Sequence, residues 1–129
     1  MRLLLDTHVL LWALSAPKML TDEGRAFIAD QANEVVVSAA SLWEIAIKHT
    51  SHRSDAPTMD AAAALDLSRR SGYSLLAISP EHVLAVATLP PLHGDPFDRI
   101  LVAQALSEPL RLLTRDRLVA AYSDTVIIV

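Results

Sequence analysis

Short apolar runs alternate along this chain with longer segments in which apolar residues recur at helical spacing. The runs are bounded by polar or turn residues and predict buried strands at residues 2–6, 34–38, 74–79, 111–114 and 125–129. The helical patterns fall between them, at residues 8–14, 22–32, 39–49, 58–70, 81–88, 96–107 and 116–121. Strands that alternate with helices predict an α/β fold, with a parallel central sheet of about five strands and helices on both faces.

Composition narrows the class of protein. The 129 residues are 52% hydrophobic, with a mean hydropathy of +0.33, which predicts one domain with a real core. Eleven Lys and Arg against fifteen Asp and Glu give a net charge of −4, which argues against a protein that binds polyanions through its overall charge alone. The chain has no cysteine, so a disulfide framework and a thiolate metal site are excluded.

The apolar amino terminus raises the question of a signal sequence. Asp6 and His8 interrupt the run MRLLLDTHVLLWAL, and no small-residue cleavage site follows, so we interpret it as mature protein. No uninterrupted apolar stretch approaches the roughly 18 residues expected of a membrane-spanning helix. We therefore expect a soluble, cytoplasmic protein without a membrane partner.

Two carboxylates follow predicted strands. Asp6 ends the first strand and Asp116 follows the run LLT. Both therefore lie at the carboxyl ends of strands, where ligands bind in the crevice of a parallel sheet. Either residue is also suited to cap the helix that comes next. Glu44 is different, because it lies within SLWEIAIK among apolar neighbours. An ion pair with Lys48, four residues on, is its ordinary structural explanation, but a buried carboxylate requires compensation of some kind.

The stretch GDPFDR, residues 94–99, places two acids at the start of a predicted helix. Asp95 before Pro96 is a strong helix start. Asp98 falls at the third helical position, where it could complete a capping box or serve chemistry. Acids at the sheet edge, in the helix after the second strand and at this helix start can converge in the crevice. Their mutual repulsion then favours a hard cation, Mg²⁺ or Mn²⁺, and a zinc site has little support.

Four motifs together resemble a known family. LLLDTH, SAASLWEIAIK, HGDPFDRILVAQAL and LLTRD, in this order over almost the entire chain, resemble PIN-domain ribonucleases, especially VapC-type toxins of prokaryotic toxin–antitoxin pairs. The resemblance implies a PIN-like three-layer sandwich and a single PIN domain over residues 1–129. It also implies a catalytic and metal-binding set, which consists of Asp6, Glu44, Asp98 and Asp116, and leaves Asp95 as the cap.

The same resemblance implies a function. We expect hydrolysis of RNA phosphodiester bonds with Mg²⁺ or Mn²⁺, inhibition by a cognate small antitoxin, and a homodimer. Thr7 and Thr114 would orient the carboxylates through hydrogen bonds. Lys48, Arg99 and Arg115 are candidates for contacts with the RNA substrate. The tract KHTSHRSDAP, residues 48–57, departs from the family pattern, so contacts made there are not implied.

Other functions remain open at this stage. The chain could be a PIN-fold RNA-processing nuclease without an antitoxin, or a non-catalytic module that binds RNA or protein. The presence of all four acids argues against the module. A phosphotransfer enzyme of the haloacid-dehalogenase type would need a second Asp two positions after Asp6, where this chain has His8.

Overall fold

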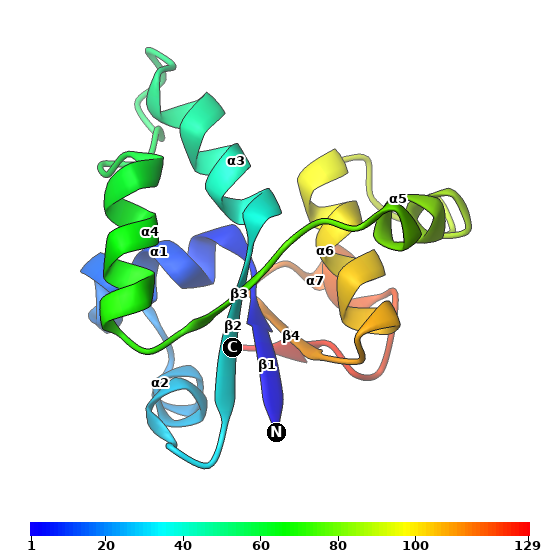
Figure 1. Ribbon diagram of the computed structural model, residues 1–129, viewed down its shortest axis with the longest axis horizontal. Coiled ribbons are helices and arrows are strands. Elements are labelled where there is room, and N and C mark those ends of the chain that lie inside the picture. The colour runs from blue at the N-terminus through cyan, green and yellow to red at the C-terminus, as the bar shows by residue number, and fades with distance from the viewer.

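A fully parallel sheet of five strands forms the centre of the molecule (Figure 1). The computed structural model describes residues 1–129. The strands are β1 (Arg2–Leu5), β2 (Glu34–Ser38), β3 (Ser74–Leu76), β4 (Arg111–Thr114) and β5 (Ile127–Ile128). Their order across the sheet is β3-β2-β1-β4-β5. The predicted α/β fold with five parallel strands is confirmed.

Seven α-helices and one short 3₁₀ helix connect the strands. They are α1 (Thr7–Ser15), the 3₁₀ helix η1 (Pro17–Met19), α2 (Asp22–Ala29), α3 (Ala39–His49), α4 (Ala61–Arg70), α5 (Pro80–Ala87), α6 (Pro96–Ser107) and α7 (Arg117–Ala120). Each predicted helix is present: α3 and α6 have the predicted ends, the ends of the other five are shifted, and η1 was not predicted. The predicted start of α4 at residue 58 is wrong, because the side chain of Asp60 caps the helix by accepting from the amide of Ala63 (2.8 Å).

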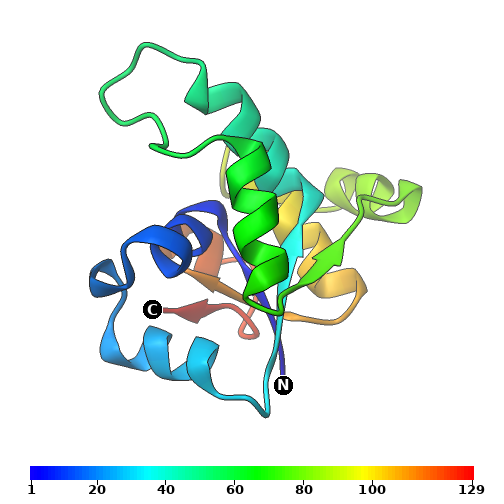
Figure 2. The same ribbon diagram turned by 60° about the vertical axis from the view of Figure 1, so that its left-hand side comes forward.

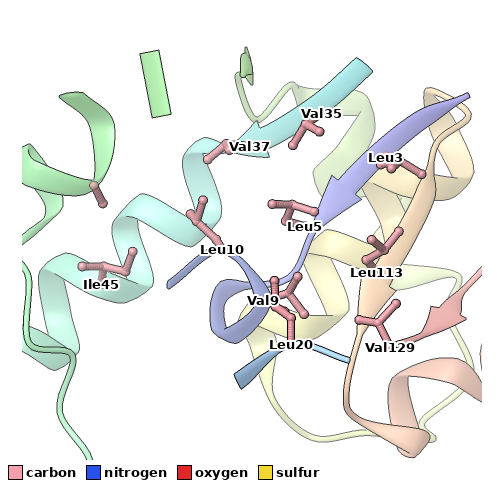
Figure 3. Close-up of a cluster of buried hydrophobic side chains, with 11 residues drawn as sticks. Leu3, Leu5, Val9, Leu10, Leu20, Val35, Val37, Ile45, Leu113 and Val129 are labelled. Atoms are coloured by element: carbon pink, nitrogen blue, oxygen red, sulfur yellow. The ribbon is translucent and has the colours of Figure 1, made fainter. Parts of the chain in front are cut away.

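Alternating side chains of β1 divide the core between the two faces of the sheet. Leu3 and Leu5 pack with residues of α1 and α3, including Leu10 and Ile45 (Figure 3). Leu4 points to the opposite face, into a second cluster built mainly by α6. All three leucines are fully buried, and each such side chain stabilises the fold by about 2 kcal/mol. The central strand is therefore packed on both sides. This packing fixes the position of Asp6, which directly follows the last residue of the strand.

The strand order creates a crevice between β1 and β4. The chain passes from β1 outward to β2 and β3, then crosses back to β4 and β5 on the other side. At such a switch point the connections leave the carboxyl ends of neighbouring strands in opposite directions, which opens a ligand site. The amide of Asp6 still donates to the carbonyl of Leu113 (3.0 Å), so the two strands stay paired up to this crevice.

Helix α3 extends beyond the carboxyl ends of the strands (Figure 1). The connection between α3 and α4 lies at its far end and forms an extended loop, which Figure 2 shows at the top of the molecule. This loop contains the polar tract of residues 50–57. No helix of the structure has the length and apolar character needed to cross a membrane.

Candidate active site

Asp6 lies at the bottom of the crevice and uses its two oxygens separately. Oδ1 accepts from the amide of Val9 (2.8 Å) and so caps α1, while Oδ2 accepts from the hydroxyl of Thr114 on β4. Burial raises the pKa of Asp6 above its usual value, and the negative charge of Glu44 adds to this, while the hydrogen bonds from Thr114 and Val9 partly offset it. The two interpretations of Asp6, helix cap and site residue, are therefore compatible.

Glu44 reaches the same crevice from α3 and is almost fully buried. Its Oε1 accepts from the hydroxyl of Thr7 (2.5 Å), and its Oε2 is paired with the ammonium of Lys48 one turn later. The ion pair expected from the sequence is thus present. It does not account for the position of Glu44 by itself, because Thr7 of α1 also holds the carboxylate by a hydrogen bond, and its negative charge acts on Asp6.

The two acids of the GDPFDR stretch have different roles in the structure. Asp95 is the N-cap of α6, and its Oδ1 accepts from the amides of Phe97 (2.8 Å) and Asp98 (3.1 Å). The capping-box alternative for Asp98 is wrong, since the amide of Asp95 donates to the Nδ1 of His93 (3.0 Å) instead. The side chain of Asp98 is free to face the crevice.

Asp98 has a strongly perturbed carboxyl group. Burial and the negative charges of Asp95, Asp6 and Glu44 raise its pKa from 3.8 to about 7, with His93 acting in the opposite direction. A carboxylate that titrates near neutrality in a crevice is typical of functional sites rather than of structural ion pairs. Asp6 and Glu44 are therefore close enough for their negative charges to act on Asp98.

Asp116 completes the set at the end of β4. Its Oδ1 accepts from the amide of Leu118 (2.8 Å) and caps α7, and its own amide donates to the hydroxyl of Thr114 (3.0 Å). Burial opposes ionisation, but the hydrogen bonds from His93 and Leu118 hold the pKa of Asp116 below its ordinary value. Its side chain is 41% exposed, which makes Asp116 the most accessible of the four acids.

Sequence reasoning missed His93. Its Nε2 lies 2.9 Å from Oδ2 of Asp116 and 3.2 Å from Oδ2 of Asp98. One potential ligand atom from each of these three residues lies within 4.8 Å of the others. The only signal in the sequence was position, because His93 immediately precedes the Gly-Asp pair that starts α6.

The donor set fits a hard divalent cation. Asp6, Glu44, Asp98 and Asp116 supply carboxylate oxygens, the ligands preferred by Mg²⁺ and Mn²⁺. The raised pKa values of Asp6 and Asp98 are consistent with this, since burial, and after it the negative charge of neighbouring acids, disfavours their ionisation. A divalent ion bound among these oxygens would relieve that repulsion.

The predicted cationic residues have well-defined partners. Lys48 is paired with Glu44, as described. Arg115 lies over the ring of Trp12, 5.3 Å from its centroid, and donates to the carbonyl of Met19 (3.1 Å). The guanidinium of Arg99 binds the connection between α5 and α6, through the carbonyls of Val86, Leu89, Pro90 and His93 and the hydroxyl of Tyr122. Arg99 therefore has a structural role, and contacts of the three cations with substrate remain predictions.

A cavity of about 350 Å³ adjoins Glu44, one of the four acids. Thr7, His8 and Glu44 form the wall shared with the site, and Lys48 and Arg53 lie further out along α3 and the loop that follows it. The cavity is large enough to admit part of a ligand beside the carboxylates. The loop that departs from the expected pattern is therefore part of the surroundings of the site.

Comparisons with known proteins agree with this architecture. The family described as PIN domain matches residues 3–124. Ribonuclease VapC22 of Mycobacterium tuberculosis is 30% identical over 115 residues, 88% of this chain and 86% of that protein. Ribonuclease VapC16 of the same organism is 36% identical over 69 residues, 51% of this chain and 49% of that protein, so the match spans about half of its length.

Two solved structures share the fold. One is VapBC2 from Rickettsia felis bound to a DNA fragment from its promoter, with a TM-score of 0.69, 16% identity, and coverage of 100% of this chain and 98% of that chain. The other is FitAcB from Neisseria gonorrhoeae, with a TM-score of 0.61, 17% identity, and coverage of 98% and 95%. At these identities the likeness concerns the fold alone.

Proposed function

The chain belongs to the PIN-domain family, and on that premise we propose that it is a divalent-metal-dependent ribonuclease and the toxin of a toxin–antitoxin pair. The observation that carries the proposal is the convergence of Asp6, Glu44, Asp98 and Asp116 at the switch point of the sheet. The names of the two Mycobacterium tuberculosis relatives, both ribonucleases, supply the substrate class.

The chemistry follows from the charge of the site. A Mg²⁺ or Mn²⁺ ion bound by the four acids would neutralise phosphate charge and supply hydroxide at neutral pH. Thr7 and Thr114 hold Glu44 and Asp6 by hydrogen bonds, so these carboxylates are oriented before an ion arrives. The pKa of Asp98, near 7, means that its proton must leave before it can act as a ligand.

RNA would approach along the cavity beside Glu44. Lys48 and Arg53 lie among its lining residues and can attract phosphates at its edge. The net charge of −4 does not oppose this, since a bound divalent ion would give the centre of the site its attraction for phosphate. The protein would then need basic residues only around the cavity.

The partners proposed are an RNA substrate, a small cognate antitoxin and a second copy of this chain, all in the cytoplasm. The solved VapBC2 assembly of Rickettsia felis, which shares the fold, supports the antitoxin. The competing candidate is a ribonuclease of RNA processing without an antitoxin. An antitoxin gene beside the gene for this chain, and growth arrest on expression without it, would distinguish the two.

The test uses two matched variants. Partner-free protein should cleave single-stranded RNA with Mn²⁺ or Mg²⁺ and lose the activity in EDTA. Asp98→Asn should abolish cleavage, whereas Asp95→Asn should keep most of it, because asparagine is also a good N-cap. Full cleavage by Asp98→Asn, or cleavage that persists in EDTA, would refute the metal-dependent site. Binding of RNA without any cleavage would favour the non-catalytic module.

A further inference from the structure

We infer that His93 is a positioning residue, whose Nε2–H donates to Asp116 while Asp98 lies against the same nitrogen, so that the imidazole holds the two carboxylates together at the metal site. The inference rests on the proposed function in that the ion is the one assigned there. The new element is the role of His93, a residue of the connection between α5 and α6. It acts on the ligands of the ion and is not itself one of the four acids.

The position of the imidazole hydrogen follows from its neighbours. The amide of Asp95 points at Nδ1 of His93, with a donor–acceptor distance of 3.0 Å. An amide can only donate, so Nδ1 carries the lone pair and the hydrogen of the neutral ring is on Nε2. That hydrogen is donated to Oδ2 of Asp116 at 2.9 Å, and Oδ2 of Asp98 lies 3.2 Å from the same nitrogen.

This arrangement excludes His93 as a ligand in the conformation observed. A metal ligand needs a lone pair on the coordinating nitrogen, and Nε2 has none while it carries the hydrogen. The three residues therefore lie within 4.8 Å of one another because the imidazole bridges two carboxylates. The remaining oxygen of Asp98 and the remaining lone pairs of Asp116 stay available to an ion.

The ring is held firmly enough to impose a geometry. The amide of His93 donates to the hydroxyl of Tyr122 (2.9 Å), and Arg99 binds the same hydroxyl (2.9 Å). The side chain of His93 is 14% exposed. Asp116 is the N-cap of a helix of only four residues and its side chain is 41% exposed, so it is the acid that gains most from a fixed partner.

Two isosteric variants separate the two ends of the ring. In His93→Asn the amide oxygen replaces Nδ1 and still accepts from Asp95, but nothing takes the place of Nε2 between the two acids. In His93→Gln the amide nitrogen replaces Nε2 and can donate to Asp116 as the ring does. Isothermal titration with Mn²⁺, in the absence of RNA, should show about 10- to 100-fold weaker binding to His93→Asn and nearly unchanged binding to His93→Gln. Thermal unfolding without metal should differ little between the two.

Two results would overturn the inference. One is an unchanged Mn²⁺ affinity of His93→Asn. The other is a ¹⁴N coupling in the electron paramagnetic resonance spectrum of the Mn²⁺-loaded protein that disappears in His93→Gln, because this would make His93 a ligand. Failure of the proposed function looks different. The protein would then bind Mn²⁺ with the expected dependence on His93 and yet leave RNA intact.

Discussion

Two histidines of this molecule make the same pair of contacts in opposite electrostatic settings. His82 accepts the amide of Ser79 at Nδ1 (3.0 Å) and donates from Nε2 to Glu108 (2.6 Å). His93 accepts the amide of Asp95 at Nδ1 (3.0 Å) and faces Asp98 and Asp116 with Nε2. In both cases the backbone amide of a helix N-cap residue donates to Nδ1, so the ring hydrogen is on Nε2.

The difference lies in the balance of donors and carboxylates. His82 is 2% exposed, has one carboxylate partner and is joined by Gln104, whose Oε1 accepts from the hydroxyl of Ser38 (2.5 Å). That network is closed and contributes to folding. Around His93 the carboxylates outnumber the donors, and burial together with these negative charges raises the pKa of Asp98. A polar cluster that the protein leaves unbalanced is suited to bind something else.

The largest effect should come from removing one of the four carboxylates of the acidic site to which the His93 cluster belongs. Asp6→Asn should lower the rate of RNA cleavage by on the order of 10³-fold, because an electrostatic partner of the reaction is lost. Helix α1 should remain capped, since asparagine also caps. Initial rates with Mn²⁺ measure this, and Asp66→Asn, an exposed acid paired with Arg70 on α4, serves as the matched control. Equal losses in the two variants would contradict the assignment.

The balanced cluster should respond in stability. His82→Ala leaves the amide of Ser79 and the side chain of Gln104 without their partner in a buried place, and should lower the free energy of unfolding by about 3 kcal/mol. His93→Ala, at a more exposed position, should cost about 1 kcal/mol. Urea denaturation of the metal-free proteins compares them. If the two substitutions cost the same, the contrast between the clusters is wrong.

The pH dependence of stability should identify Asp98. Between pH 3.8 and about 7 the folded, metal-free protein keeps a proton on Asp98 that the unfolded chain has released, so the free energy of unfolding falls as the pH rises. Asp98→Asn removes this loss. At pH 8 the variant should therefore be more stable than the original protein by about 2 kcal/mol, a value discounted for partial exposure.

The same comparison at pH 4 provides the control. Asp98 is then protonated in the folded protein, so the advantage of Asp98→Asn should almost vanish. Thermal melts in chelator at both pH values are sufficient. A gain that is equal at pH 4 and pH 8 would mean that packing, and not charge, causes it.

The smallest effect should come from Lys48. Its side chain is 45% exposed, and its ion pair with Glu44 spans one helical turn, so Lys48→Ala should change the free energy of unfolding by about 0.5 kcal/mol or less. Thr7 still donates to Glu44 in this variant. A loss of several kcal/mol in urea denaturation would show that Lys48, rather than an ion, is the principal compensation for Glu44.

The fold was accessible from the sequence because apolar periodicity depends on local neighbours. All five strands and all seven α-helices were predicted near their observed places. Errors occurred where single contacts decide, as at Asp60, whose cap starts α4 three residues later than its helical pattern suggests. The strand predicted at 125–129 keeps only Ile127–Ile128, since apolar residues by themselves do not specify how far pairing with β4 extends.

The site was predicted less completely. Asp6, Glu44, Asp98 and Asp116 could be proposed because the topology and the family motifs indicate where they lie. The double use of Asp6 and Asp116, as helix caps and as residues of the crevice, could not be decided from sequence, since each carboxylate has two oxygens with different partners. His93 escaped prediction because its place depends on the path of a connection.

That path has a practical consequence for engineering this protein. Exposed, proline-containing connections ordinarily accept inserted residues, tags or grafted epitopes. Here the guanidinium of Arg99 binds backbone carbonyls at several points between Val86 and His93. The number of residues in this connection is therefore constrained by the reach of one side chain. An insertion before His93 would move the imidazole away from the acids, and safer places for a graft lie in the loop between α3 and α4, away from its cavity wall.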